Sequence, residues 1–220
     1  TAGIAWRTAI WKKMKQHPKI ATICVIIIIA LLIPLVRFLT GDVQGSRLRA
    51  AIENGDVAKI ESILKKYKPS EEKSNDYFFA IDRSYSEKYR SVVPILVAHG
   101  FNINAPSTQD PAGATALIFM LEFNSPTGTV EIMLANGASP EVKDKNGRTA
   151  LHYAVLSEFA PGPNDYNYDV YIRNIQNVLN AMKGRGEQLI NAPDNSGKTA
   201  LDIARERGMS DVVKLFETYK

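Results

Sequence analysis

Cysteine is almost absent from this sequence, because Cys24 is the only one among 220 residues. A single thiol can form no disulfide within the chain and excludes a metal site built from several cysteines. Histidine is nearly as scarce, since His17, His99 and His152 are the only three and stand far apart. We therefore expect neither a disulfide framework nor a metal centre. His152, which stands in a repeated segment, is expected to have a structural role.

The residue patterns of common catalytic sites are also missing. The sequence has no Gly-x-Ser-x-Gly and no pair of carboxylates in a recognisable cleft, so nothing predicts a nucleophile with its base. Gly197-Lys198-Thr199 resembles the end of a phosphate-binding loop, but that motif requires glycine at residue 192, where this chain has Ala192. We expect a protein that is not an enzyme and that has no cofactor and no small-molecule substrate.

Strong charge of one sign is confined to one end of the chain. Residues 1–44 carry six basic side chains and one acidic, a net charge of +5. The other 176 residues carry 21 basic and 22 acidic side chains, a net charge of −1. A nearly neutral domain gives no electrostatic reason to expect binding to nucleic acid.

Long apolar runs are absent with one exception. Residues 20–36 carry no charge, and with Arg37, Phe38 and Leu39 the segment reaches the ~20 residues that cross a bilayer. A buried core helix and a cleaved signal peptide are the alternatives. No small-residue cleavage site follows the run. The sequence therefore predicts an uncleaved transmembrane helix over 20–39 that contacts the lipid bilayer.

Segment 1–19 has the composition of a juxtamembrane segment, with a disordered basic tail as the alternative. Tryptophan suits the membrane interface, and lysine suits an anionic inner leaflet. Five basic residues precede the uncharged run 20–36, and three (Arg37, Arg47 and Arg49) follow it closely. The positive-inside rule therefore predicts a cytoplasmic N-terminus in the inner (plasma) membrane. The rest of the chain would be extracytoplasmic, in the periplasm of a bacterium. The predicted membrane-interface residues are Trp6, Trp11, Lys12, Lys13, Lys15, Lys19 and Arg37.

One sequence motif recurs in the remainder of the chain. Asn146-Gly147-Arg148-Thr149-Ala150-Leu151-His152-Tyr153-Ala154 predicts a turn followed by a helix, because Asn-Gly readily adopts positive φ and threonine caps helices. Related segments begin at Gly113, 34 residues before Gly147, and at Gly197, 50 residues after it. Each is followed by a second apolar run. A turn and two helices with a period of about 33 residues describe the ankyrin repeat, and the segment from Thr149 resembles that family's Thr-Pro-Leu-His-x-Ala, with alanine for proline.

The resemblance implies an all-α ankyrin-repeat solenoid of about five helix-turn-helix units. We expect 40–45 to be a short linker and 46–220 to be the repeat domain, with a polar first unit as its cap and a degenerate second unit. With the predicted span, this describes a membrane-anchored member of the family from a bacterium.

Two regions are predicted to bind a partner protein. The first is an insertion at 158–169, where prolines and glycine disfavour regular structure and aromatic residues suit an interface. An alternative is that these aromatic side chains cover their own repeat. The candidates here are Phe159, Asp165, Tyr166, Tyr168, Asp169 and Tyr171. The second region is the concave surface that the resemblance implies for the turns, and its candidates are Lys143, Lys145, Asn146 and Arg148.

The predicted function is protein binding. The sequence indicates a single-pass, membrane-anchored module that holds a partner, expected to be a membrane-associated or secreted enzyme. It would act as a scaffold, or as an inhibitor of the kind an immunity protein represents. The alternative is an accessory subunit of a larger membrane complex, held there by its transmembrane helix.

Overall fold

The computed structural model describes most of the chain after residue 42. The described residues are 43–69, 77–78, 89–108, 110–157, 162, 165 and 167–219. The chain divides into two compact units, Thr1–Ser46 and Arg47–Lys220, and the first lies almost wholly outside the described residues. The account below concerns the second unit.

The described residues form α-helices joined by turns, without a strand. All the helices are short, from 5 residues in α11 to 14 in α10. They are α3 (Val43–Glu53), α4 (Val57–Leu64), α6 (Tyr89–Ala98), α7 (Ala116–Glu122), α8 (Thr127–Ala135), α9 (Ala150–Leu156), α10 (Tyr168–Ala181), α11 (Gly186–Ile190), α12 (Ala200–Glu206) and α13 (Ser210–Glu217).

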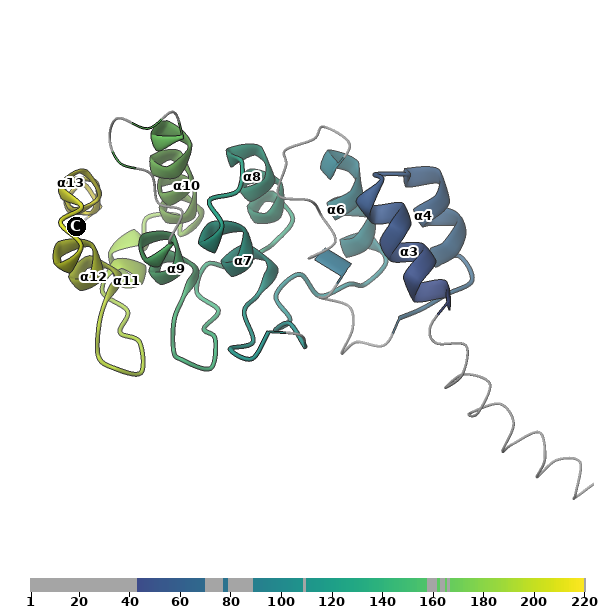
Figure 1. The fold of residues 1–220 in the computed structure, drawn as a ribbon, viewed down its shortest axis with the longest axis horizontal. Coiled ribbons are helices and arrows are strands. Elements are labelled where there is room, and N and C mark those ends of the chain that lie inside the picture. Colours follow the sequence, from purple (N-terminus) through teal and green to yellow (C-terminus); the bar gives the residue numbers. More distant parts are fainter. Residues whose placement is uncertain are drawn as a thin grey trace, which may run out of the picture. The chain divides into compact units, whose positions relative to one another are not determined.

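The helices pair and the pairs stack side by side. Helices α7, α9 and α12 pack against one another in that order, and α8 packs against both α6 and α10. Figure 1 shows the first set as one layer, from which the long turns extend, with α8 and α10 in a second layer. Units three, four and five are the pairs α7–α8, α9–α10 and α12–α13. The stacking places the turn of each unit beside the turn of the next.

Threonine begins the first helix of each of these three units, as the sequence predicts. Thr115, Thr149 and Thr199 are the N-cap residues of α7, α9 and α12. At α12 the Thr199 hydroxyl accepts from the Asp202 amide at 3.1 Å, and the Asp202 carboxylate accepts from the Thr199 amide at 3.0 Å. At α9, Thr149 is the N-cap residue and His152 takes the place of the aspartate: the Thr149 amide donates to Nδ1 of His152 at 3.1 Å. These bonds satisfy amides that a helix start otherwise leaves unpaired.

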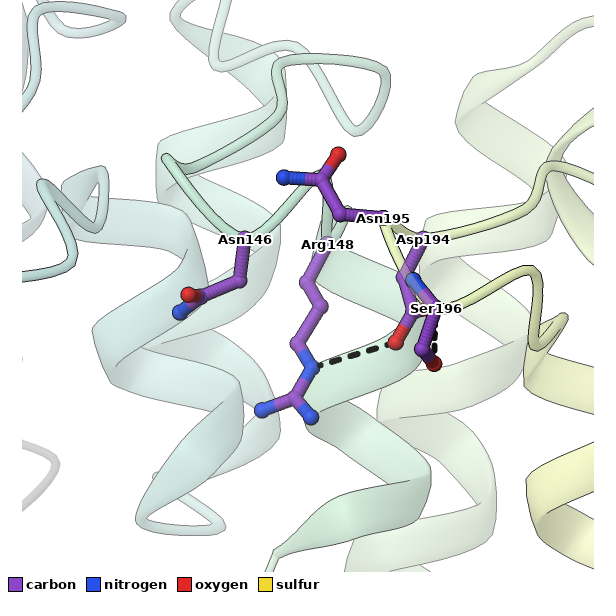
Figure 2. A pocket seen from close by; sticks show the side chains of 5 residues that line it. All are labelled: Asn146, Arg148, Asp194, Asn195 and Ser196. Atoms are coloured by element: carbon purple, nitrogen blue, oxygen red, sulfur yellow. Dashed lines mark hydrogen bonds and ion pairs between the residues drawn. The ribbon is translucent and has the colours of Figure 1, made fainter.

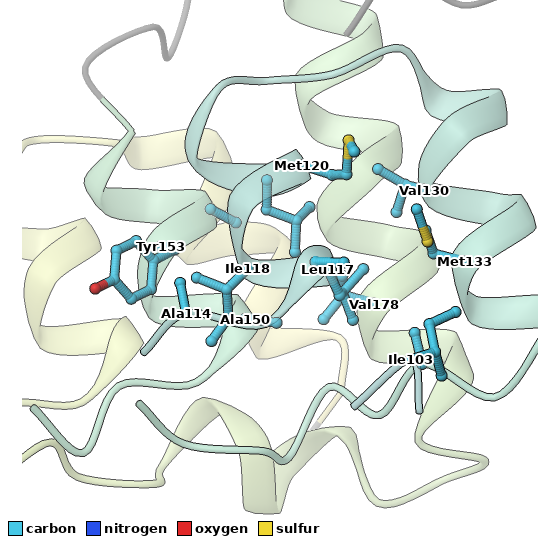
Figure 3. Close-up of a cluster of buried hydrophobic side chains, with 14 of the residues drawn as sticks. Ile103, Ala114, Leu117, Ile118, Met120, Val130, Met133, Ala150, Tyr153 and Val178 are labelled. Atoms are coloured by element: carbon cyan, nitrogen blue, oxygen red, sulfur yellow. The ribbon is translucent and has the colours of Figure 1, made fainter. Parts of the chain in front are cut away.

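The core lies between the two helix layers. Leu117 of α7, Met133 of α8 and Val178 of α10 are each at most 1% exposed and belong to one cluster (Figure 3). Ala150 and Ala154 of α9 are at most 2% exposed, and their small side chains let neighbouring helices approach closely. Burial of such aliphatic side chains contributes about 25 cal/mol for each Å² removed from water. This packing fixes the positions from which the turns project.

The predicted division into five units agrees with the helix pairs, with one addition. Helices α3 and α4 form the first pair, and the second unit contains a helical turn at Tyr77 and Phe78 followed by α6. The sequence did not predict α11, which lies in the insertion after α10. Gly186 begins this helix and lies against the ring of Tyr219. A side chain would not fit there unless the ring moved, because a Cβ on residue 186 would lie 2.9 Å from the ring.

The predicted fold class is wrong in one part, the transmembrane helix. Among the described residues no helix is both long enough and apolar enough to cross a membrane. The longest, α10, has 14 residues, whereas a span needs ~20. Segments 1–19 and 20–39 lie outside the described residues, and so do the predicted interface residues Trp6, Trp11, Lys12, Lys13, Lys15, Lys19 and Arg37. The predicted location in the cell stays a prediction.

Candidate functional site

Three successive turns share one construction. Asp110, Asp144 and Asp194 each stand three residues before a glycine with positive φ, at residues 113, 147 and 197. The carboxylate of Asp144 accepts from the amide of Asn146 at 2.9 Å and from the amide of Arg148 at 2.7 Å. Because the aspartate binds the backbone that follows it, each turn holds its shape. We call these residues the third turn (110–114), the fourth turn (144–148) and the fifth turn (194–198).

Hydrogen bonds join each turn to the next. The Lys145 amide donates to the carbonyl of Ala112 at 2.9 Å, which joins the fourth turn to the third. The Asn195 amide donates to the carbonyl of Asn146 at 2.9 Å, and the Asn195 side chain donates to the carbonyl of Lys145 at 2.9 Å. The fourth and fifth turns are therefore held at a fixed spacing by their backbones.

A pocket of about 360 Å³ lies between the fourth and fifth turns. Figure 2 shows its lining, which comes from both turns: Asn146, Arg148, Asp194, Asn195 and Ser196. The two asparagines and the serine are exposed, and Asp194 is only 8% exposed. The pocket thus offers amide, hydroxyl and guanidinium groups on a rigid backbone, with no apolar side chain among the five.

The charged pair in this pocket is Arg148 and Asp194. Nε of Arg148 lies 3.5 Å from Oδ2 of Asp194, and the arginine side chain is 36% exposed. The hydrogen bond from the Ser196 hydroxyl is the largest influence on Asp194. With the amides of Lys198 and Ser196, and with Arg148, it lowers the pKa of Asp194 to about 2. Asp194 is consequently ionised at neutral pH, where it holds the arginine in place.

His152 connects the same two units from beneath the turns. It is fully buried, with Nδ1 2.9 Å from the Thr149 hydroxyl and Nε2 3.1 Å from the carbonyl of Lys198. Desolvation is the main reason that its pKa is lowered from the ordinary value. The predicted structural role is confirmed by this geometry. Among the described residues, no group of three His, Cys, Asp or Glu side chains could hold a metal ion.

The four residues predicted from the turns all lie in this region. Asn146 and Arg148 line the pocket. Lys143 and Lys145 are exposed beside it, and each Nζ donates to a backbone carbonyl of a neighbouring turn. The acceptor for Lys143 is Pro193 at 2.8 Å, and for Lys145 it is Pro111 at 2.9 Å.

The predicted aromatic insertion is only partly described. Phe159 and Tyr166 lie outside the described residues. Asp165 is exposed and accepts from the amide of Gly162. Tyr168 and Asp169 are not in a loop, because they form the first turn of α10. The Tyr168 hydroxyl donates to the carboxylate of Asp211 at 2.9 Å, so this side chain lies against the fifth unit.

Tyr171, which was predicted to bind a partner, is buried in the repeat domain. It is 3% exposed, and its hydroxyl lies 3.7 Å from the sulfur of Met209. Burial raises the pKa of this phenol strongly, so it stays protonated. The side chain lies against Met209 of the fifth unit and so packs between neighbouring units. Tyr171, Ile175 and Val178 are spaced as one helical face, and that spacing could have identified the helix.

The contribution of the fifth turn to the pocket was not predicted from the sequence. Asp194, Asn195 and Ser196 supply three of the five residues that line the pocket. An aspartate three residues before each repeat glycine was a visible signal for the turn construction. The pocket itself had no such signal, because an insertion separates its two halves by 46 residues along the chain.

Comparison with known proteins identifies the repeats. Residues 80–162 match the family of ankyrin repeats in three copies. The chain is 43% identical to ankyrin repeat protein L92 of Acanthamoeba polyphaga mimivirus over 47 residues, which is 21% of this chain and 11% of that protein. It is 35% identical to Protein HOS4 of Saccharomyces cerevisiae over 66 residues, which is 30% of this chain and 6% of that protein. The matches thus span a small part of each relative, and what they establish is that this chain contains ankyrin repeats.

Proposed function

We propose that this chain is a protein-binding module that contacts its partner through the fourth and fifth turns, as a scaffold or as an inhibitor of an enzyme. Ankyrin repeats generally bind other proteins. The observation that carries the choice of surface is the polar pocket between these turns, where Asn146, Asn195 and Ser196 expose hydrogen-bonding groups. The family's concave surface includes the same turns.

The rigidity of the turns supports this proposal. A surface that must be ordered on binding loses affinity, because each immobilised side chain costs ~0.5–1.5 kcal/mol. Here the Asn195 side chain and the Asn195 amide are already bonded to the fourth turn. The partner would therefore meet donors and acceptors that are in position before contact.

The chemistry of the site favours binding over catalysis. The buried His152 uses both ring nitrogens within the structure, so it has no nitrogen with which to take a substrate proton. Asp194 accepts from Ser196, Lys198 and Arg148 and is held ionised, which suits a structural carboxylate. The Ser196 hydroxyl donates to Asp194 at 2.6 Å, but a carboxylate whose pKa is lowered to about 2 is a weak base toward that hydroxyl.

Site-specific crosslinking tests the proposal. A photo-reactive amino acid at Ser196, in the pocket, should crosslink the full chain to a partner protein in cells of the source organism. The same amino acid at Arg173, which is exposed on α10 in the other helix layer, is the matched control. Equal crosslinking to the same partner from both positions, or from position 173 alone, would refute the choice of surface.

A further inference from the structure

Within the two segments that line the pocket, the exposed charges are positive, and one of them pairs with an exposed carboxylate on α12. In 143–148 and 194–198 the exposed or half-exposed charged side chains are Lys143, Lys145, Arg148 and Lys198. The two acidic residues of these segments, Asp144 and Asp194, are each 8% exposed and accept hydrogen bonds from their own turns. The acidic groups are therefore turned inward and the cations outward.

These cations differ in whether they already form an ion pair within the chain. Lys198 pairs with Glu206 of α12, with 2.6 Å between Nζ and the carboxylate. Lys143 and Lys145 each donate to one backbone carbonyl, and no ion pair is recorded for either among the described residues. An ammonium has three donors, so each lysine keeps donors for another group.

Arg148 lines the pocket with a guanidinium that is bonded on one side only. Its Nε faces Asp194 at 3.5 Å. Its two terminal nitrogens make no recorded hydrogen bond within the described part of the chain. Figure 2 shows both nitrogens turned away from Asp194. A guanidinium in this state presents two parallel N–H groups, the geometry that binds a carboxylate through both of its oxygens.

We propose that this surface binds an acidic segment of the partner protein, with one aspartate or glutamate carboxylate on the terminal nitrogens of Arg148. Lys143 and Lys145 flank the segment, and Asn146, Asn195 and Ser196 hydrogen-bond to its backbone. Asp194 is a positioning residue, because it holds Nε and leaves the two terminal nitrogens for the carboxylate. This inference rests on the proposed function and adds the chemistry of the partner.

A peptide suits this surface better than a nucleic acid. Residues 45–220 carry a net charge of −1, so the cations form a local cluster within a domain that does not attract a polyanion as a whole. Binding along a phosphate backbone draws on many contacts spread over a basic face. The neutral amides and hydroxyl beside Arg148 match the alternating charged and neutral groups of a peptide.

Fluorescence anisotropy with defined probes tests the inference. The full chain, kept in solution with a mild detergent, is titrated into a labelled twelve-residue peptide of alternating glutamate and glycine. The matched probe replaces each glutamate with glutamine, and a labelled single-stranded oligonucleotide of equal charge is the third probe. Arg148→Gln removes the guanidinium, and Arg148→Lys keeps the charge without the paired N–H groups. Arg173→Gln removes an exposed arginine from α10 as the control.

The expected pattern separates this inference from others. The glutamate peptide should bind, Arg148→Gln should weaken it about tenfold or more, Arg148→Lys should weaken it less, and Arg173→Gln should leave it unchanged. Equal binding of the glutamine peptide, or unchanged binding by Arg148→Gln at an unchanged melting temperature, would overturn it. Tighter binding of the oligonucleotide would also overturn it, in favour of a phosphate site. Crosslinking at Ser196 that is insensitive to Arg148→Gln would leave the proposed function standing and reject the acidic segment.

Discussion

The fourth turn requires glycine at residue 147, for two reasons. Gly147 has φ 77°, a conformation that costs other residues about 1–2 kcal/mol. It is also buried beneath the fifth turn, where an added Cβ would come within 2.8 Å of the backbone nitrogen of Asn195. Gly197 has a similar φ of 83°, but a Cβ there would meet nothing within 4 Å. Substitution at Gly197 would therefore report the cost of backbone strain alone, and substitution at Gly147 would report that strain together with the loss of contact between the turns.

Replacing each glycine by alanine measures the contact between turns. Gly197→Ala should lower the free energy of unfolding by about 1 kcal/mol, from backbone strain alone. Gly147→Ala should lower it by about 3 kcal/mol, because the strain is joined by displacement of Asn195 and of its bonds to Lys145 and Asn146. Urea denaturation followed by circular dichroism gives both values. Equal losses would show that the contact adds nothing to stability.

His152 should make stability depend on pH. Its pKa is lowered in the folded chain, so between the folded value and the ordinary 6.5 the unfolded chain binds more protons. Stability should therefore fall as pH drops below 6.5, and the loss should be complete once pH passes below the folded pKa. Protonation would also break the bond between Nδ1 and the Thr149 amide.

Thermal unfolding between about pH 7.5 and 5.5 checks this expectation. His152→Gln should be less stable at pH 7.5 and should lose part of the pH dependence. His99→Gln, at an exposed position just after α6, is the matched control for replacing a histidine by glutamine. If His152→Gln and the unchanged chain lose the same amount of stability as pH falls, then His152 is not the cause of the pH dependence.

At the scale of elements, the helix pairs were predictable and α10 was only partly so. Threonine followed by Ala-Leu marks a helix start because it combines a cap with the first buried residues, and this located α7, α9 and α12. The start of α10 was mistaken because Pro161 and Pro163 favour a loop, and the loop was extended too far. The helical spacing that begins at Tyr171 was the stronger signal, since it determines which side chains reach the core.

Tyr171 should hold α10 against its neighbours. Tyr171→Ala would remove a buried ring and leave a cavity, which should cost about 3 kcal/mol or more. Tyr168→Phe is the comparison from the same turn, and it should cost about 1 kcal/mol or less because it removes one exposed hydrogen bond to Asp211. Urea denaturation measures both. If Tyr171→Ala were as mild as Tyr168→Phe, and if it weakened partner binding instead, Tyr171 would be an interface residue after all.

At the scale of the whole repeat domain, most contacts join neighbouring units. Helix α9 packs on both α7 and α12, whereas α12 packs on α9, α11 and α13. Stability in such a stack is approximately a sum over units and the interfaces between neighbours. The sequence predicted this order through its repeats, but it could not place the pocket, which needs the spacing of two turns in three dimensions.

A terminal unit in this stack should open without its neighbours. Phe216 of α13 is fully buried, and Phe216→Ala should cost about 3–5 kcal/mol within the fifth unit. Helix α13 packs chiefly on α12 and meets α10 through the bond between Asp211 and Tyr168. Among the described residues, neither helix of the fifth unit packs on the third unit. The loss should therefore raise hydrogen exchange in α12 and α13 while α7 and α8 stay protected. Leu151→Ala, at a fully buried position in α9, is the matched interior change and should raise exchange in the units on both sides. Hydrogen exchange resolved by helix distinguishes the two variants. A uniform rise from α7 to α13 in the Phe216 variant would mean that the repeats unfold as one cooperative body, and the nearest-neighbour description would then be wrong for this chain.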